Sequence, residues 1–266
     1  RNDAKEDVTG SLQAPHPFNS EFQNFLDTEK DIQVYPSTFT MKDHISILVN
    51  LNKLNISGKG VGALAGKDFG NLHMHSGPND FADHIVEANM GVPELVQKTM
   101  LKKVNFGDGS IYKMDMTPME YYGITDEEVM NGYQMRDIMF LFPTTDWAAT
   151  GVAASGDNFV LQCGEVEPEP DPVFSTFPTR LSQLDFLTIM RQYDDGMTNL
   201  NYEITGGNTT LRGEFGGTRQ LRTVTVNLLD GFKSEQNLDR LHIVVTRNGN
   251  VVEDKTIPLV PVSEIE

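Results

Sequence analysis

The chain is divided by residues 164–178, which read Gly-Glu-Val-Glu-Pro-Glu-Pro-Asp-Pro-Val-Phe-Ser-Thr-Phe-Pro. Each proline removes a backbone donor and restricts the residue before it to extended conformations. The acidic side chains between the prolines repel one another and keep the segment straight. A helix or a central strand is therefore excluded, and the stretch is predicted to be an extended, solvated connector between two packed units.

The two sides of this connector differ in composition. Residues 1–163 carry 12 basic and 22 acidic side chains, and ten of the basic ones are lysine. Residues 179–266 carry 9 basic and 12 acidic side chains, and seven of the basic ones are arginine. We therefore predict four segments, namely a mobile arm over residues 1–14, a β-sandwich with helical insertions over 15–163, the acidic Pro-rich connector over 164–178, and a smaller β-sandwich over 179–266.

Alternation of apolar residues is the main signal in the first predicted sandwich. Ile45, Ile47, Val49 and Leu51 lie two apart, which is the period of a half-buried strand. Short helices are predicted over residues 20–27 and 81–90, after Pro93, and behind two Thr-x-x-Glu capping boxes at 117–120 and 125–128. This region is predicted to be a sheet structure with short helices inserted between its strands.

The second predicted sandwich has the clearest turn in the chain. Asn248-Gly249 lies between two apolar runs and accepts the positive φ angles of a type I′ hairpin. Residues 181–193 are ambiguous, because their leucines are spaced by three as in a helix. Pro258 and Pro261 place the last strand at a sheet edge. The complete pattern predicts a mainly β fold of two antiparallel, jelly-roll-like sandwiches.

The net charge and the single cysteine exclude several classes of protein. The net charge of the 266 residues is −17, so neither nucleic acid nor an anionic membrane is an expected partner. No apolar run approaches the roughly 20 residues that a membrane span needs. Cys163 stands alone, which excludes an intrachain disulfide and a multi-cysteine zinc site. Its acidic neighbours are expected to raise its pKa and to disfavour a reactive thiolate.

His73-Met74-His75 is the local pattern that most suggests a chemical role. On a strand, residues two apart point to the same side, as zinc or copper ligands often do. His84 lies within reach on the predicted helix that follows, so the pattern is compatible with a divalent metal held by three histidines. The alternative is that these imidazoles make only local hydrogen bonds, since no His-Glu-x-x-His motif supplies a general base.

Three aromatic residues are the candidate contact positions for a ligand. Trp147 is the single tryptophan, and it suits either a carbohydrate platform or a packed core or interface position. The second reading is favoured, because no other tryptophan accompanies it. Tyr121 and Tyr122 are predicted as exposed aromatic residues of a concave site.

The sequence favours a non-enzymatic structural subunit that assembles into a viral shell, as a capsid-type coat protein does, or into an extracellular appendage. Its partners would be copies of itself or other structural subunits, and it would be located in a virion or outside the cell. The alternatives are a secreted or surface-anchored module that binds a glycan or a protein, and a metal-dependent enzyme that uses His73 and His75. Catalytic and cofactor-binding residues are not assigned, because the chain has no nucleophile elbow, phosphate loop or dinucleotide fingerprint.

Overall fold

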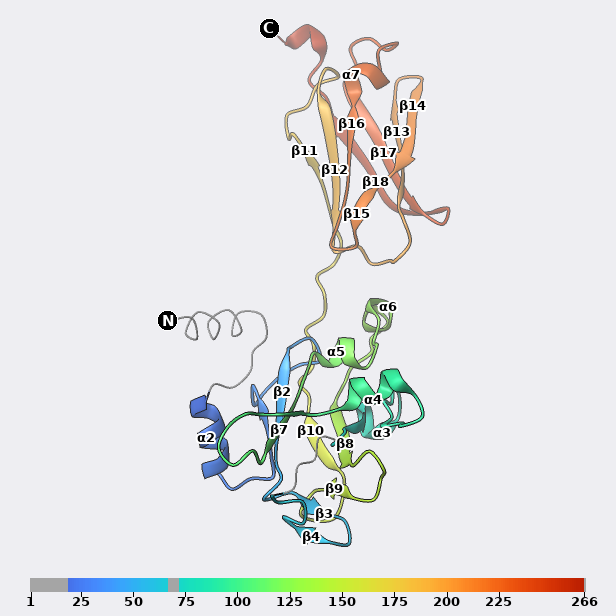
Figure 1. Cartoon of the computed structure of the whole chain (residues 1–266). Coiled ribbons are helices and arrows are strands. Elements are labelled where there is room, and N and C mark those ends of the chain that lie inside the picture. Colours follow the sequence, from blue (N-terminus) through green and yellow to red (C-terminus); the bar gives the residue numbers. More distant parts are fainter. Residues whose placement is uncertain (1–18, 67–71, 266) are drawn as a thin grey trace. The chain divides into compact units, whose positions relative to one another are not determined.

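The computed structural model of the chain describes residues 19–66 and 72–265 (Figure 1). The chain forms two compact units, unit 1 (Arg1–Glu167) and unit 2 (Pro168–Glu266), and each has its own hydrophobic core. Strands account for 41% of the residues and helices for 15%, so the predicted mainly β fold class is confirmed. The predicted arm over residues 1–14 lies outside the described residues.

Unit 1 contains two antiparallel sheets that pack on one core. The first sheet has the order β1-β2-β7-β6, with bounds Ile32–Tyr35, Ile45–Asn50, Ile111–Met116 and Lys102–Lys103. The second has the order β10-β8-β9-β3-β4, with bounds Phe159–Gln162, Asp137–Pro143, Thr150–Val152, Asn55–Ile56 and Gly60–Val61, and β5 (His75–Gly77) also pairs with β8. Ile45 and Ile47 of β2 lie in the same buried cluster as Phe140 and Phe142 of β8, so the two sheets enclose this core between them.

Strand β2 is buried on both faces, although its alternation predicts a half-buried strand. All six of its residues are buried. The face away from the main core is covered by helix α2 (Asn19–Asp27), whose Phe22 and Phe25 cluster with Leu48. The amphipathic helix predicted over residues 20–27 is therefore confirmed, and it supplies the cover that the sequence pattern did not reveal.

Three further predicted helices of unit 1 are confirmed, and one is wrong. Helices α4 (Pro93–Thr99) and α6 (Asp126–Met130) begin where predicted, and Thr125 and Glu128 form the capping box of α6. Helix α5 (Pro118–Tyr121) is present without a side-chain cap. The helix predicted over residues 81–90 is replaced by a single turn, α3 (Pro78–Phe81), with left-handed backbone at Asn79, Asp80 and Phe81.

Contacts with the start of β8 and the segment before it explain why that predicted helix does not form. The side chain of Asn79 donates to the carbonyl of Gln134 (3.1 Å) and accepts from the amide of Arg136 (2.8 Å). The amide of Asp80 donates to the carboxylate of Asp137 (2.9 Å). These bonds hold the turn in a conformation that ends the helix.

Unit 2 is an eight-stranded antiparallel sandwich. One sheet has the order β11-β12-β16-β15 (Val173–Phe177, Phe186–Gln192, Leu221–Asn227, Gly216–Thr218), and the other has the order β14-β13-β17-β18 (Thr209–Glu214, Asn201–Gly206, Arg240–Arg247, Asn250–Pro258). Helix α7 (Leu228–Gly231) follows β16. When β11 is counted as strand one, the first sheet has the order 1-2-6-5 and the second has the order 4-3-7-8. This is the strand arrangement of immunoglobulin-type sandwiches, and it refines the predicted jelly-roll-like fold.

Local predictions for unit 2 have mixed outcomes. The hairpin at Asn248-Gly249 is confirmed, with φ angles of 50° and 81°, and β18 lies at a sheet edge as its prolines indicate. Residues 181–193 do not form a helix, because most of them make up strand β12, which pairs on both sides. Two flanking strands thus override a helical spacing that is a weak local preference.

The stretch over residues 164–178 was predicted to be a solvated connector, but most of it contacts one of the two units. Gly164 bridges to Thr40, and the amide of Val166 donates to the side chain of Gln134 (3.2 Å), so its first residues belong to unit 1. Glu169 pairs with Arg219 of unit 2. Strand β11 occupies five residues of the stretch, at the edge of a sheet. The prolines exclude a central strand, but edge pairing is compatible with them.

A buried ion-pair network joins the two sheets of unit 2. The carboxylate of Asp194 is fully buried and accepts hydrogen bonds from Arg191 on β12, Arg222 on β16 and Arg247 on β17. Glu253 on β18 accepts a further bond from Arg191 (3.1 Å). Three guanidinium groups therefore converge on one carboxylate inside the sandwich. Removing one of these groups would leave the others buried without full charge compensation, which is destabilising.

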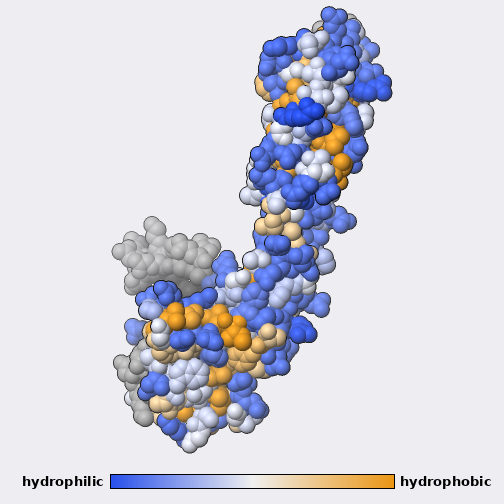
Figure 2. Space-filling view, turned by 90° about the vertical axis from the view of Figure 1, so that its right-hand side faces the viewer, coloured by the Kyte–Doolittle hydropathy of each residue, from blue (hydrophilic) through white to orange (hydrophobic). Residues whose placement is uncertain are grey.

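The surface is mainly hydrophilic. In Figure 2, hydrophilic residues cover most of both units in that view, and hydrophobic residues gather in a few areas. Among the described residues, no helix combines the length and the apolar character that a bilayer span requires.

Candidate functional site

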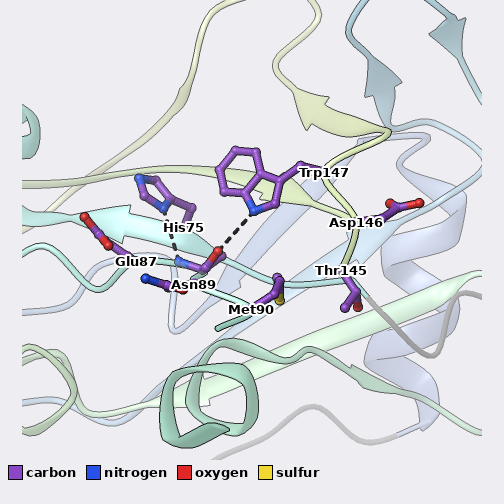
Figure 3. A pocket seen from close by; sticks show the side chains of 8 residues that line it. His75, Glu87, Asn89, Met90, Thr145, Asp146 and Trp147 are labelled. Atoms are coloured by element: carbon purple, nitrogen blue, oxygen red, sulfur yellow. Dashed lines mark hydrogen bonds between the residues drawn. The ribbon is translucent and has the colours of Figure 1, made fainter. Parts of the chain in front are cut away.

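An open depression on unit 1, with a volume of about 480 Å³, is the candidate functional site (Figure 3). Three segments that are distant in the sequence form it. They are strand β5, the extended segment before α4, and the loop between β8 and β9. The lining residues are His75, Glu87, Ala88, Asn89, Met90, Thr145, Asp146 and Trp147.

The loop between β8 and β9 presents Trp147 to solvent. The amide of Trp147 donates to the carbonyl of Thr144 (2.8 Å), and the carboxylate of Asp146 accepts from the hydroxyl of Thr144 (2.7 Å) and the amide of Ala148 (3.0 Å). These bonds close a tight turn in which Trp147 has a φ of 55°. Trp147 is 45% exposed, so it does not fill a core, and the interface position that the sequence also favours stays a prediction.

A chain of hydrogen bonds fixes the orientation of the indole (Figure 3). The Nε1–H of Trp147 donates to the carbonyl of Ala88 (3.1 Å), and the amide of Ala88 donates to Nδ1 of His75 (3.2 Å). The two rings meet edge to face, with centroids 5.5 Å apart. Because the polar end of the indole is satisfied by backbone, its exposed face is available for an apolar contact.

The hydrogen bond to Nδ1 also determines the protonation state of His75. Nδ1 accepts, so the neutral imidazole carries its proton on Nε2. Burial lowers the pKa of His75 below its ordinary value, and the nearby carboxylate of Glu87 opposes this shift. His75 is therefore neutral at neutral pH, and protonating Nδ1 would set two N–H groups against each other.

The backbone around the depression is strained. Phe81, His84 and Trp147 all have positive φ angles, between 44° and 56°, although bulky side chains disfavour this region. Such residues cost roughly 1–3 kcal/mol each and persist where the surroundings hold them, which is common at functional sites. Phe81 also contacts the ring of His75, with centroids 5.7 Å apart.

The three histidines predicted as metal ligands have separate partners. Nδ1 of His73 bonds Thr99 (3.1 Å) and its Nε2 bonds Thr145 (2.9 Å), while Nε2 of His84 bonds Glu128 (2.7 Å). Within residues 19–66 and 72–265, no group of three or more His, Cys, Asp or Glu side chains could hold a metal ion. The described geometry therefore gives the predicted divalent metal site no support.

The tyrosines predicted as exposed contacts are packed into unit 1, which corrects that expectation. Tyr122 is 4% exposed, and its hydroxyl donates to Ser76 (2.8 Å). Tyr121 is half-buried and packs edge to face on Tyr122, and the ammonium of Lys98 lies 5.0 Å from its ring centroid. Their burial follows from α5, a single turn at the margin of the main core.

The depression has an acidic and polar rim. Glu87, Asn89 and Asp146 are exposed at its edge, and neither lysine nor arginine lines it. In Figure 3, Glu87 and Asn89 lie on the His75 side of the indole, and Thr145 and Asp146 lie on the other side. Hydrogen bonds from Thr144 and Ala148 lower the pKa of Asp146, so this carboxylate is ionised and engaged in the turn. The arrangement suits a ligand without negative charge.

Cys163 is expected to be chemically inert in the folded protein. Burial raises its pKa from 9.0 to about 11, and the carboxylates of Asp43 and Asp137 add to the shift. The direction agrees with the sequence prediction, although burial contributes more than the acidic neighbours. At a given pH near 8, the thiolate fraction falls about 100-fold. Iodoacetamide should therefore alkylate the native protein about 100-fold more slowly than the urea-unfolded chain, and equal rates would contradict the assignment.

The sequence matches no known protein family and no curated protein. Among solved structures, the chain is similar to FdeC, a broadly conserved Escherichia coli adhesin that elicits protection against urinary tract infections. The match has 9% identity and a TM-score of 0.28, and it covers 87% of this chain and 65% of that one. The chain thus spans less than two thirds of that structure, and its function is argued below from its own residues.

Proposed function

We propose that this chain is a non-catalytic binding module of a surface-exposed or extracellular protein, and that it holds a neutral glycan in the depression at Trp147. The exposed, fixed indole carries this proposal. An aromatic face held rigidly at a concave site offers an apolar platform to a sugar ring at little entropic cost. The hydroxyl, amide and carboxylate groups of Thr145, Asn89 and Glu87 can bond sugar hydroxyls around it.

The residues that line the depression disfavour anionic and cationic ligands. An anion would meet Glu87 and Asp146 with no lysine or arginine in the lining. A quaternary ammonium is typically enclosed by several aromatic rings, whereas here one indole is exposed and the His75 ring meets it edge-on. A neutral, polyhydroxylated ligand agrees best with one platform and a few polar groups.

Removing the indole should abolish most of the binding. The full chain is titrated with neutral oligosaccharides, which are first selected on a glycan array, and binding is followed by emission of Trp147, the single tryptophan. Burying one large apolar side chain is worth about 1.5–3 kcal/mol, so Trp147→Ala should weaken binding about 10- to 100-fold in calorimetry.

Trp147→Phe should retain part of the affinity, because it keeps a ring but loses the bond to Ala88. Val61→Ala is the matched control, since Val61 is 64% exposed on the same unit and does not line the depression. An array without a neutral glycan ligand, or equal affinities of the wild type and Trp147→Ala, would refute the proposal. Selective binding of cationic ligands would instead identify an ammonium site.

A further inference from the structure

Unit 2 exposes one sheet face that carries no charge, which we call the neutral face. Its members are the outward residues of strands β11, β12 and β16. The inward positions of the same strands are identified by Leu187, Ile189 and Val226, which lie in the core of unit 2. The neutral face consists of Val173, Ser175, Phe177, Phe186, Thr188, Met190, Gln192, Leu221, Thr223, Thr225 and Asn227.

Strand register places these residues on one continuous surface. Phe177 lies opposite Thr188, and Thr188 lies opposite Thr225, to which it is hydrogen-bonded at 2.9 Å. Residues directly opposite in an antiparallel pair share a face, and diagonal neighbours remain within reach of aromatic side chains. Phe186 is such a diagonal neighbour of Phe177, so the two rings lie at the same end of the neutral face.

Both phenylalanines are unusually exposed for their size. Phe177 is 64% exposed and Phe186 is 61% exposed. Val173 and Leu221 are 46% and 40% exposed at the other end of the same surface. The exposed apolar side chains thus lie at both ends of the face, with serine and threonine residues between them, and apolar groups exposed in this way on one surface favour an interaction surface.

The absence of charge on this face favours a second copy of the chain as its partner. The chain has a net charge of −17, so most contacts between two copies would place acidic groups together. The neutral face avoids this cost. Its threonine, glutamine and asparagine side chains both donate and accept hydrogen bonds, so each can pair with the same residue type on a second copy. A charged macromolecule would find no complementary charge there.

We propose that the neutral face pairs with the same face of a second copy of this chain. Strands β12 and β16 have seven residues and β11 has five, so the face covers about 24 Å by about 14 Å, or roughly 340 Å² on each copy. That is less than the roughly 800 Å² per partner of a standard specific interface, so we expect a weak dimer that forms only in roughly the micromolar to millimolar range. This contact would give the self-association that the sequence favours, and it is independent of the Trp147 depression.

Sedimentation equilibrium of the full chain from 10 µM to 1 mM tests the proposal. The wild type should show a reversible dimer, and raising NaCl from 0.15 M to 0.5 M should leave it unchanged or strengthen it, because salt screens repulsion between acidic copies. Phe186→Glu should weaken the dimer at least tenfold by placing two buried carboxylates at the contact. Phe177→Ser should weaken it less.

Val251→Glu is the matched control, because Val251 is 60% exposed on β18 in the other sheet of unit 2. Circular dichroism checks that each variant is folded. A strict monomer at 1 mM, a dimer that Phe186→Glu leaves intact, or a dimer weakened by salt would each overturn the proposal, and the last would indicate an ion-paired contact elsewhere.

Discussion

Asp194→Ala is expected to destabilise unit 2 by about 3–5 kcal/mol. The Asp194 carboxylate is fully buried and is shared by Arg191, Arg222 and Arg247, whose side chains are 4%, 6% and 15% exposed. Without it, three guanidinium groups remain close together, and Glu253 and the 60% exposed Asp195 are their remaining ion-pair partners in the described network. Breaking a buried ion pair by removing one partner costs about 3–5 kcal/mol.

That loss is a large fraction of the stability of a domain of this size, which is about 5–15 kcal/mol. Urea unfolding of the full chain should be followed by circular dichroism and by hydrogen exchange of β12, β16 and β17. Hydrogen exchange of these strands reports on unit 2 alone, circular dichroism reports on both units, and fluorescence of Trp147 reports on unit 1. Asp230→Ala is the control, because this carboxylate is 74% exposed and pairs with an exposed lysine. A loss below 1 kcal/mol for Asp194→Ala would show that the network contributes little.

Acid is expected to destabilise unit 1 through His73 and His75. Burial lowers the pKa of both imidazoles below 6.5; a backbone hydrogen bond at Val96 opposes the shift at His73, and Glu87 opposes it at His75. As the pH falls below 6.5, the imidazoles of His73 and His75 become protonated in the unfolded chain but stay neutral in the folded unit. The free energy of unfolding should therefore fall by up to about 1.4 kcal/mol per pH unit for each histidine, until the pH reaches the lower folded pKa.

Burial is the main reason why both histidines remain neutral in the folded unit, and their hydrogen bonds fix which ring nitrogen carries the proton. The hydroxyl of Thr99 donates to the carbonyl of Leu95 (2.7 Å), so it accepts from His73. His75 accepts from the amide of Ala88, and its protonation would also disturb the bond that holds Trp147. Acid should therefore weaken ligand binding at the depression in addition to lowering the stability of unit 1.

Urea unfolding followed by Trp147 fluorescence at pH 7.5 and 5.0 measures this effect. His75→Gln keeps a hydrogen-bond acceptor but does not titrate, so it should reduce the pH dependence, and a double variant with His73→Gln should remove most of it. His242→Gln is the control, because this exposed histidine of unit 2 bonds Asp254. Equal stability of the wild type at both pH values would show that these imidazoles do not control unit 1.

The candidate site was only partly predictable. Trp147 stands out in the sequence because it is the single tryptophan, but its exposure depends on a bond to Ala88, 59 residues away. The sequence did not indicate that Glu87 and Asn89 line the site, because both lie within residues 81–90, which were predicted to form a helix. The His73-Met74-His75 pattern predicted a metal site, but both ring nitrogens of His73 are hydrogen-bonded to threonines of two other segments.

The sequence by itself determined the β-rich class, the acidic surface and the elements that depend on near neighbours, such as the Asn248-Gly249 hairpin and the capped start of α6 at Thr125. These follow from backbone preferences and hydrogen bonds that act over a few residues. Tertiary structure alone decided that residues 181–193 join a sheet, that the three histidines have separate partners and that the indole of Trp147 faces solvent. Each of these depends on segments that meet only after folding, when burial and distant hydrogen-bond partners outweigh local preference.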